Sequence, residues 1–460
     1  MSKTTEHPVS GSFRDPSGHL FFREGLLYRQ VNPSYSSNYD LLVSSGLYDQ
    51  LVGKQLLVAH DEVDLPIEGA YKFLRPELIP LISYPYEWSF SQLKDAALAT
   101  LRIQELAIHK GMALKDASAF NIQFNEGRPV FIDTLSFEAY REGEPWVGYR
   151  QFCQHFLAPL ALMSLSDIRL GSLSAKYIDG VPLDLASQLL PGKSWLKFGL
   201  LTHLHLHARS QKAYEGETKA PVSKGSVSKT AMLGIVDSLK SIVKGLSWKP
   251  AGTTWGDYYS ATNYSDAAFD KKKELVDSFI GEVSPEAVWD LGANTGVFSR
   301  LAGDRGIPTV AFDIDPAAVE LNYLHCRKNK YTKMLPLLMD LSNPSPALGW
   351  LGEERHSFFQ RGPVDLVLAL ALIHHLAIGN NVPLPGIAEF FSRVCRNLVV
   401  EFVPKSDSQV RRMLAVREDV FPDYRQEQFE AVFESYFHLV KSVPVAGSER
   451  TLYLMTRKAH

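Results

Sequence analysis

The sequence predicts an α/β protein whose C-terminal half is built on a mainly parallel sheet. From residue 287 onward, short apolar runs that suit buried parallel strands alternate with helical segments. A glycine-containing turn joins the first of these runs to the helix that follows it. A Lys-, Ser-, Gly- and Pro-containing stretch, residues 210–229, separates this half from an α+β N-terminal half and reads as a linker. The expected parts are an N-terminal domain over residues 1–210, a linker and docking helix over 211–250, and a C-terminal domain over 251–460.

The glycine turn lies in AVWDLGANTGVFSRLAGDRGIPTVAFDID, residues 287–315. We expect strands at 288–291 and 308–312, with a helix opening between them at Thr295. Glycine permits positive φ and close approach of a ligand to the backbone. Ligands in open α/β sheets bind at the carboxyl ends of the strands, so this order predicts a nucleotide-type crevice.

The spacing of the turn differs from that of a dinucleotide fingerprint, because Asn294 stands where GxGxxG requires glycine and Asp290 precedes Gly292 by two positions. The turn resembles motif I of class I S-adenosylmethionine (SAM) methyltransferases. This resemblance implies SAM as cofactor and a seven-stranded Rossmann-like sheet whose last strand is antiparallel. It also implies that Asp290 faces the cationic amino group of the cofactor. Asp313 follows Asp290 by 23 residues, close to the interval of about 20 at which a carboxylate reaches a ribose diol.

The later segments continue the same order. The expected elements are a helix at 315–328, strands at 334–339, 364–370 and 397–402, a helix at 426–436, and a terminal hairpin formed by 438–445 and 451–457. In the family, an acid after the third strand holds the adenine amino group, which here is Asp340. The cofactor-binding residues that the resemblance implies are Asp290, Gly292, Ala293, Asn294, Gly296, Asp313, Ile314 and Asp340.

The catalytic candidates are His374, His375 and Glu401. The two histidines follow the fourth strand in ALIHHL, a position that resembles the acceptor side of small-molecule methyltransferases. Either His375, the preferred one, takes a proton from the acceptor or orients it, or both histidines pack against the cofactor or cap a helix. Glu401 ends the fifth strand and is either a second acid or base or a carboxylate that faces a helix.

The acceptor is not specified by the sequence. The Asn/Asp-Pro-Pro-Tyr/Phe signature of amine methylation on nucleic-acid bases is missing, and no cysteine ends the fourth or fifth strand. We expect a small-molecule or glycoconjugate acceptor, with a hydroxyl favoured. The alternative is a bifunctional or regulatory protein with an ATP-binding, kinase-like N-terminal module.

Composition narrows the class of protein. The 460 residues are 45% hydrophobic and carry a net charge of -3, which does not indicate a nucleic-acid partner. Three well-separated cysteines fit neither a disulfide framework nor a paired metal site. The N-terminus has no apolar signal core, and the longest apolar runs are shorter than the ~20 residues of a membrane span. We expect a soluble, cytoplasmic protein without a metal, and the oligomeric state stays open.

The N-terminal half contains a second pattern in residues 109–137. Asp116, Asn121 five positions later, and Asp133 after a hairpin-like turn resemble the catalytic and metal-binding loops of protein-kinase-like phosphotransferases. An apolar helix is expected before this loop at 90–109, preceded by a hinge strand at 77–88. No glycine-rich phosphate loop is present. Either the resemblance implies a degenerate kinase-like fold that binds an acceptor or a nucleotide, or the segment is a helix, a turn and a hairpin whose acids face solvent or cap a helix.

Three further features complete the expectations. His203, His205 and His207 would share one face of a strand but not of a helix, and they are either metal ligands or ordinary packed histidines. Residues 231–246 carry a helical apolar stripe that we expect to dock on one of the domains. Aromatic residues before the first helix of the C-terminal domain either fold over the cofactor or belong to the core; they are Trp255, Tyr258, Tyr259 and Tyr264.

Overall fold

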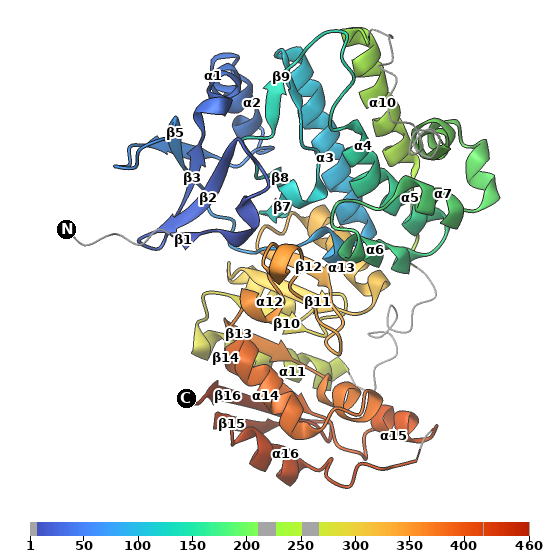
Figure 1. Cartoon of the computed structure of the whole chain (residues 1–460). Helices are drawn as coiled ribbons and strands as arrows, with labels where there is room; N and C mark the ends of the chain where they lie inside the picture. The colour runs from blue at the N-terminus through green and yellow to red at the C-terminus, as the bar shows by residue number, and fades with distance from the viewer. Residues whose placement is uncertain (1–6, 210–226, 251–265, 417, 460) are drawn as a thin grey trace. The chain divides into compact units, whose positions relative to one another are not determined.

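The computed structural model describes residues 7–209, 227–250, 266–416 and 418–459 (Figure 1). Its compact units are Met1–Lys249 with Leu348–Arg355, and Pro250–Ala347 with His356–His460. Most of the expected linker and the aromatic segment from Trp255 to Tyr264 lie outside the described residues.

The N-terminal unit opens with a five-stranded antiparallel sheet. Its strands, in spatial order, are β1 (His7–Pro8), β2 (Gly18–Arg23), β3 (Leu26–Val31), β5 (Lys72–Pro76) and β4 (His60–Val63). Helices α1 (Ser36–Ser44) and α2 (Leu47–Gly53) connect β3 to β4. Tyr35, Tyr39 and Leu74 are buried together in a core cluster of this region.

The long helix α3 (Phe90–His109) begins and ends where the sequence predicts, because Ser89 caps it and Gln92 completes a capping box. After α3, strand β6 (Met112–Leu114) pairs with β9 (Phe137–Ala139), and β7 (Ile122–Asn125) forms a hairpin with β8 (Arg128–Phe131). The expected strand at 77–88 is wrong. This proline-containing stretch forms no strand, and a 3-10 turn covers Pro85–Glu87.

The remainder of this unit is helical. Its α-helices are α4 (Tyr149–Phe152), α5 (Ala158–Leu165), α6 (Leu173–Lys176), α7 (Leu183–Leu189), α8 (Phe198–Leu200) and α10 (Lys229–Gly245). The predicted docking helix α10 packs against α3, where Lys240 forms an ion pair of 2.9 Å with Glu105. Lys94 of α3 donates to the carbonyl oxygen of Leu246 just beyond α10. None of the helices formed by the described residues combines the length and the apolar content needed to cross a bilayer.

The segment Leu348–Arg355 lies far along the chain but packs with the N-terminal unit. The guanidinium of Arg14 donates two hydrogen bonds of 2.7 Å to the carboxylate of Glu354. The guanidinium of Arg355 lies 4.4 Å from the ring centroid of Phe120, a residue of the loop that contains Asn121. A piece of the C-terminal half of the sequence is therefore an integral part of the N-terminal unit.

Replacing Glu354 with alanine is expected to loosen this segment. The Glu354 side chain is almost fully buried whereas that of Arg14 is half exposed, so the loss of unfolding free energy should be moderate, about 1–2 kcal/mol. Amide hydrogen exchange in residues 348–355 should accelerate, whereas exchange in the C-terminal sheet should not. The exposed neighbour Glu353, replaced in the same way, is the matched control. Equal protection of the segment in both variants would contradict the anchoring role.

The C-terminal unit contains the predicted seven-stranded sheet. Its spatial order is β12 (Met334–Leu338), β11 (Thr309–Asp313), β10 (Val288–Leu291), β13 (Val364–Ala369), β14 (Cys395–Phe402), β16 (Thr451–Arg457) and β15 (Phe437–Pro444). Strands β10 to β14 are parallel, and the last strand, β16, pairs antiparallel with both of its neighbours. The predicted strands and the antiparallel last strand are thus confirmed.

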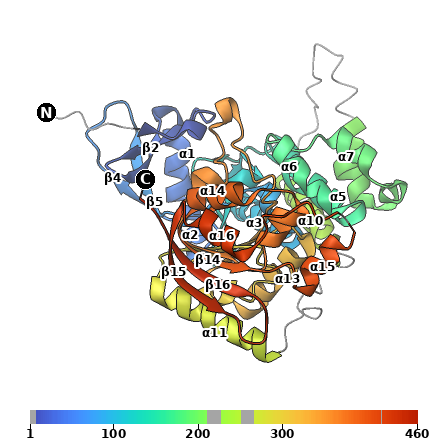
Figure 2. The ribbon, with the colours of Figure 1, turned by 90° about the horizontal axis from the view of Figure 1, so that it is seen from below.

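Helices cover both faces of this sheet. Those of the unit are α11 (Asp266–Val283), α12 (Ser299–Asp304), α13 (Pro316–Asn329), α14 (Leu384–Val394), α15 (Ser408–Leu414) and α16 (Gln426–Phe433). Figure 2 shows α11 on one side of the strands β14 to β16, and α14 and α16 on the other. On the α11 face, Val276 and Ile280 belong to the same core cluster as Val288. On the α14 face, the ring of Phe390 stacks on Phe358, and the ring of Trp289 packs against Phe358 at a tilt of 40°.

Candidate functional site

The predicted turn lies at the carboxyl end of β10, the strand at which the direction of the sheet order reverses. The strand that follows β10 in the chain, β11, pairs on one side of it, and β13 pairs on the other. A crevice at such a switch point is the usual ligand site of an open α/β sheet. The amide groups of Gly292 and Ala293 both donate to the carbonyl oxygen of Phe312, which ties the turn to the end of β11.

Three residues of the turn have positive φ: Gly292 at 80°, Asn294 at 50° and Gly296 at 75°. Gly296 is the more constrained glycine, because a Cβ atom there would lie 2.5 Å from Nδ2 of the buried Asn322 on α13. At Gly292 an added Cβ would lie 3.4 Å from the nearest side-chain atom, Cδ1 of Leu372. Gly296 therefore fixes how closely the turn approaches α13. Helix α12 begins at Ser299, four residues later than the sequence indicated.

The carboxylate of Asp313 holds the turn from the next strand. Its Oδ2 accepts a hydrogen bond of 2.7 Å from the amide of Asn294, and its Oδ1 accepts one of 2.8 Å from the amide of Asp315. Asp315 in turn caps α13 by accepting from the amide of Ala317. Burial raises the pKa of Asp313 to about 6.

Asp290 lies inside the unit with an exposed fraction of only 2%. Its Oδ2 accepts a hydrogen bond of 2.5 Å from the hydroxyl of Ser299 at the start of α12. Burial raises its pKa to about 7, opposed by the Ser299 hydrogen bond, while the nearby Asp313 raises it further. Asp290 is therefore poised near neutrality, where a bound cation would draw it into the charged form.

Ile314, directly after β11, has a side chain that is 58% exposed. An apolar side chain in this position offers a surface for the flat face of a base, next to the carboxylate of Asp313. Asp340 follows β12 and is half-buried, and its Oδ1 accepts hydrogen bonds from the amide and hydroxyl of Ser342. The eight predicted cofactor-binding residues thus all fall at the carboxyl ends of the adjacent strands β10, β11 and β12.

The two histidines follow β13 at the same edge of the sheet. His374 is 1% exposed, and its Nδ1 has no hydrogen-bond partner among the described residues. His375 begins a π-helical turn, His375–Gly379, and is half-buried. Burial lowers the pKa of His375 to about 4 and that of His374 well below its usual value, and the charge of Arg450 lowers both further. Both rings are neutral at neutral pH, and His375 is the more accessible of the two.

Glu401 is fully buried and belongs to an ion network that was not predicted from the sequence. Its Oε2 lies 2.7 Å from Nζ of Lys272 on α11, and its Oε1 lies 3.9 Å from Arg450. Arg450 also donates a hydrogen bond of 2.8 Å to Asp407, which caps α15. This burial favours the second of the two interpretations of Glu401, a carboxylate that faces a helix, over an acid or base that meets the acceptor.

The apolar periodicity of the sequence around Lys272 indicates that this lysine is buried. Lys271, Lys272 and Lys273 are consecutive, but only position 272 is three residues after Phe269 and four before Val276, on the apolar stripe of α11. The structure accordingly buries Lys272 to 3% exposure. No comparable pattern marks Arg450, which lies in the turn before β16.

The structure also brings the three N-terminal loop residues together. Asn121 and Asp133 both act on the Asp116 carboxyl, and the Asn121 amide donates to the Ser136 hydroxyl at 3.4 Å. However, Oδ1 of Asp133 is 2.6 Å from the guanidinium of Arg29 on β3, and its Oδ2 accepts from the hydroxyl of Ser136. The residues present do not favour a magnesium ion, because the positive charge of Arg29 already neutralises Asp133 at the place where the metal would bind.

The histidines of LTHLHLH lie in a helical region, and their polar contacts are with protein groups. His203 hydrogen-bonds to the Tyr149 hydroxyl at 2.8 Å, and His205 to the Ser194 hydroxyl at 2.9 Å. His205 also stacks on Trp195. Within the part of the chain that the structure describes, no group of three or more His, Cys, Asp or Glu side chains could hold a metal ion.

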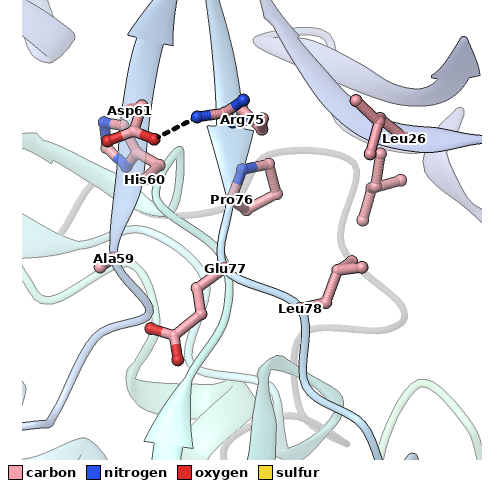
Figure 3. Close-up of a pocket in the computed structure, with 9 residues that line it drawn as sticks. Leu26, Ala59, His60, Asp61, Arg75, Pro76, Glu77 and Leu78 are labelled. Carbon is pink, nitrogen blue, oxygen red and sulfur yellow. Dashed lines mark hydrogen bonds and ion pairs between the residues drawn. The ribbon is translucent and has the colours of Figure 1, made fainter.

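A pocket of about 370 Å³ lies elsewhere, at the end of the N-terminal sheet where β3 and β5 diverge (Figure 3). Leu26, Pro76 and Leu78 supply apolar walls, and the ion pair between Arg75 and Asp61, at 2.8 Å, lies beside them. It contains none of the candidate cofactor-binding or catalytic residues that the sequence indicated.

The fold defines an α/β protein with a seven-stranded sheet, whose switch point carries an acid-flanked glycine turn. The chain belongs to the family of the nodulation protein NoeA of Rhizobium meliloti (strain 1021). The two are 36% identical over 462 residues, which cover 98% of this chain and 96% of NoeA. No protein-family model matches the chain.

Solved structures resemble only part of the chain, with TM-scores far below 0.5. Magnesium protoporphyrin IX methyltransferase (ChlM) from Synechocystis PCC 6803 is 14% identical, with a TM-score of 0.32, and covers 44% of this chain and 93% of its own. A SAM-dependent methyltransferase from Aquifex aeolicus is 15% identical, with a TM-score of 0.31, and covers 46% of this chain and 100% of its own. The bifunctional kinase-methyltransferase WbdD is 14% identical, with a TM-score of 0.30, and covers 47% of this chain and 45% of its own.

Proposed function

We propose that the protein is a SAM-dependent methyltransferase whose C-terminal unit binds the cofactor. The observation that carries this proposal is the acid-flanked glycine turn at the switch point, which gathers Asp290, Asp313, Ile314 and Asp340 at one edge of the sheet. The seven-stranded order with an antiparallel last strand agrees with the family that the turn resembles.

The residues at this edge fit the chemical parts of SAM. The buried Asp290 would hold the cationic amino acid end, Asp313 the ribose diol, Ile314 one face of the adenine, and Asp340 the adenine amino group. Gly292, Ala293, Asn294 and Gly296 would form the backbone of the turn against the cofactor. When bound, SAM supplies an electrophilic methyl group on its sulfonium. The task left to the chain is to align an acceptor with that group.

On the acceptor side, we propose that His375 orients the acceptor. With a pKa of about 4 its neutral ring is a weak base, so a hydrogen bond that positions the acceptor is favoured over removal of its proton. We further propose that the N-terminal unit selects the acceptor, a small molecule or glycoconjugate with a hydroxyl favoured.

Binding of SAM should depend on pH through Asp290. Its pKa of about 7 means that the carboxyl group is mostly protonated at pH 6 and mostly ionised at pH 8, and only the ionised form attracts the amino group. We therefore expect affinity to rise about tenfold between pH 6 and pH 8. Calorimetric titration across this range measures the effect. A pH-independent affinity would show that Asp290 does not face the cofactor's charge.

Transfer of a labelled methyl group tests the activity itself. Extracts of a strain that lacks the protein should accumulate the unmethylated acceptor, and adding the protein with methyl-labelled SAM should label it. Protein with Asp290→Asn is the matched control and should leave the label in SAM. If both proteins label no fraction more than a blank does, the methyltransferase assignment is wrong.

A second candidate function is nucleotide binding by the N-terminal unit. It is favoured by the grouping of Asp116, Asn121 and Asp133 after α3, as the kinase-like resemblance implies. Because Asp133 forms an ion pair with Arg29, we propose nucleotide binding without phosphoryl transfer. ATP should raise the melting temperature of the full-length protein equally with magnesium and with a chelator. Absence of any shift at millimolar ATP would reject this candidate.

A further inference from the structure

The register of the C-terminal sheet places Asp290 and Glu401 on the same face. Asp290 pairs with Leu368 of β13, and Leu368 pairs with Val399 of β14. Paired residues of neighbouring strands point to the same face, as do residues two apart on one strand, so Glu401 shares the face of Val399 and Asp290. This is the face that α11 covers, since Val399 clusters with Val276 of that helix.

Lys272 reaches this face from α11. Its Nζ lies 2.7 Å from Oε2 of Glu401 and 4.8 Å from the ring centroid of Phe298. Phe298 immediately precedes Ser299, whose hydroxyl donates to Asp290. Glu401 lies two strands across and two residues along the sheet from Asp290, about 12 Å at the usual spacings. The ammonium group of Lys272 therefore lies against Phe298, next to the start of α12, and acts electrostatically on the Asp290 carboxyl.

A buried ion pair is an inefficient way to stabilise a fold. Withdrawing each charge from water costs several kcal/mol, and well-packed apolar residues of similar volume often do as well or better. Position 272 lies on an apolar stripe where an aliphatic side chain would continue the core. The presence of lysine there points to an electrostatic role.

We propose that Lys272 is a positioning residue for the candidate cofactor site, and that its buried ammonium group, fixed by Glu401, favours the ionised form of Asp290 that binds the cofactor. This inference rests on the proposed function, because it assigns a purpose to the charge of Asp290. Lys272 acts through Asp290 and need not touch the cofactor.

Other charged and polar groups also act near Asp290. From β11, Asp313 opposes its ionisation, and from α11, Lys272 favours it. Arg450 lies 3.9 Å from Glu401. The charges of Arg450 and Lys272 both lower the pKa of the neutral His374. Burial lowers the pKa of Lys272 itself, and Glu401 opposes this effect. Glu401 thus favours the charged form of Lys272, and Lys272 in that form favours the ionisation of Asp290.

The test is a titration of Asp290 in the full-length, ligand-free protein. Carboxyl carbons of aspartate are labelled with ¹³C, and the Asp290 signal is assigned by its loss in Asp290→Asn. In Lys272→Met the titration midpoint should move upward by about one pH unit, because the cation that favours the carboxylate is gone. Lys272→Arg should restore the midpoint of the unaltered protein. The matched control is Lys271→Met, which removes an exposed lysine from the same helix and should change nothing.

Removing one partner of a buried pair can unfold the unit, so Lys272→Met with Glu401→Gln provides a second route without an uncompensated charge. Its midpoint should also move upward, by less. An unchanged midpoint in either folded variant overturns the proposal. Titration uses no cofactor, so a failure of SAM to bind at any pH would overturn the proposed function while leaving the link between Lys272 and Asp290 measurable.

Discussion

Replacing Asp290 with asparagine is expected to lower the affinity for SAM by at least about 100-fold, roughly 3 kcal/mol. Asparagine has the same shape and its amide oxygen can still accept the hydrogen bond from Ser299, but the negative charge that faces the amino group is lost. Unfolding free energy should change by less than about 1 kcal/mol, because the substitution removes a buried carboxyl group without leaving a cavity. Isothermal titration and thermal unfolding measure the two quantities separately.

Asp423→Asn serves as the control, since this exposed aspartate of the same unit lies outside the candidate site. It should bind SAM as the unaltered protein does. Undiminished affinity in Asp290→Asn would remove Asp290 from the site, whereas a collapse of thermal stability would show that its role is structural.

Replacing Gly296 with alanine should have the second large effect, on stability and binding together. The added methyl group would lie 2.5 Å from Nδ2 of Asn322, whose side chain is buried on α13, and the residue would also be held at a φ of 75°. The turn would have to move away from α13, which displaces the backbone that approaches the cofactor. Denaturant unfolding and SAM titration should both show a loss.

Gly306→Ala separates the effect of backbone strain from that of the contact with Asn322. Gly306 also has a positive φ, 79°, but an added Cβ would meet nothing within 4 Å. It should therefore cost only the backbone strain, and Gly296→Ala should exceed it by about 2 kcal/mol. Equal losses would mean that Asn322 gives way freely and that close packing at Gly296 does not shape the turn.

The sheet was predictable because its signals are local. Val288–Leu291 and the later strands are short apolar runs bounded by turn residues, and the acids that follow them fall at one edge by the geometry of a parallel sheet. Helix α3 was predictable from the apolar spacing of residues 90–109, and the capping box of Ser89 and Gln92 fixes its start.

The buried charges beneath the site were not foreseen, because they depend on contacts between distant segments. Lys272, Glu401 and Arg450 come from a helix, a strand and a turn that only the folded sheet brings together. Arg29 was not foreseen for the same reason. Its ion pair with Asp133 changes how the pattern of Asp116, Asn121 and Asp133 is interpreted. The docking of Leu348–Arg355 on the N-terminal unit has no local sequence signature at all.

The central claim is that the turn after β10 binds SAM. Isothermal titration of the full-length protein with SAM, and with its demethylated product S-adenosylhomocysteine, tests it most directly. The account predicts saturable binding of both ligands at one site per chain, lost in Asp290→Asn and retained in Asp423→Asn. No binding of either ligand at millimolar concentration to the folded protein would contradict it.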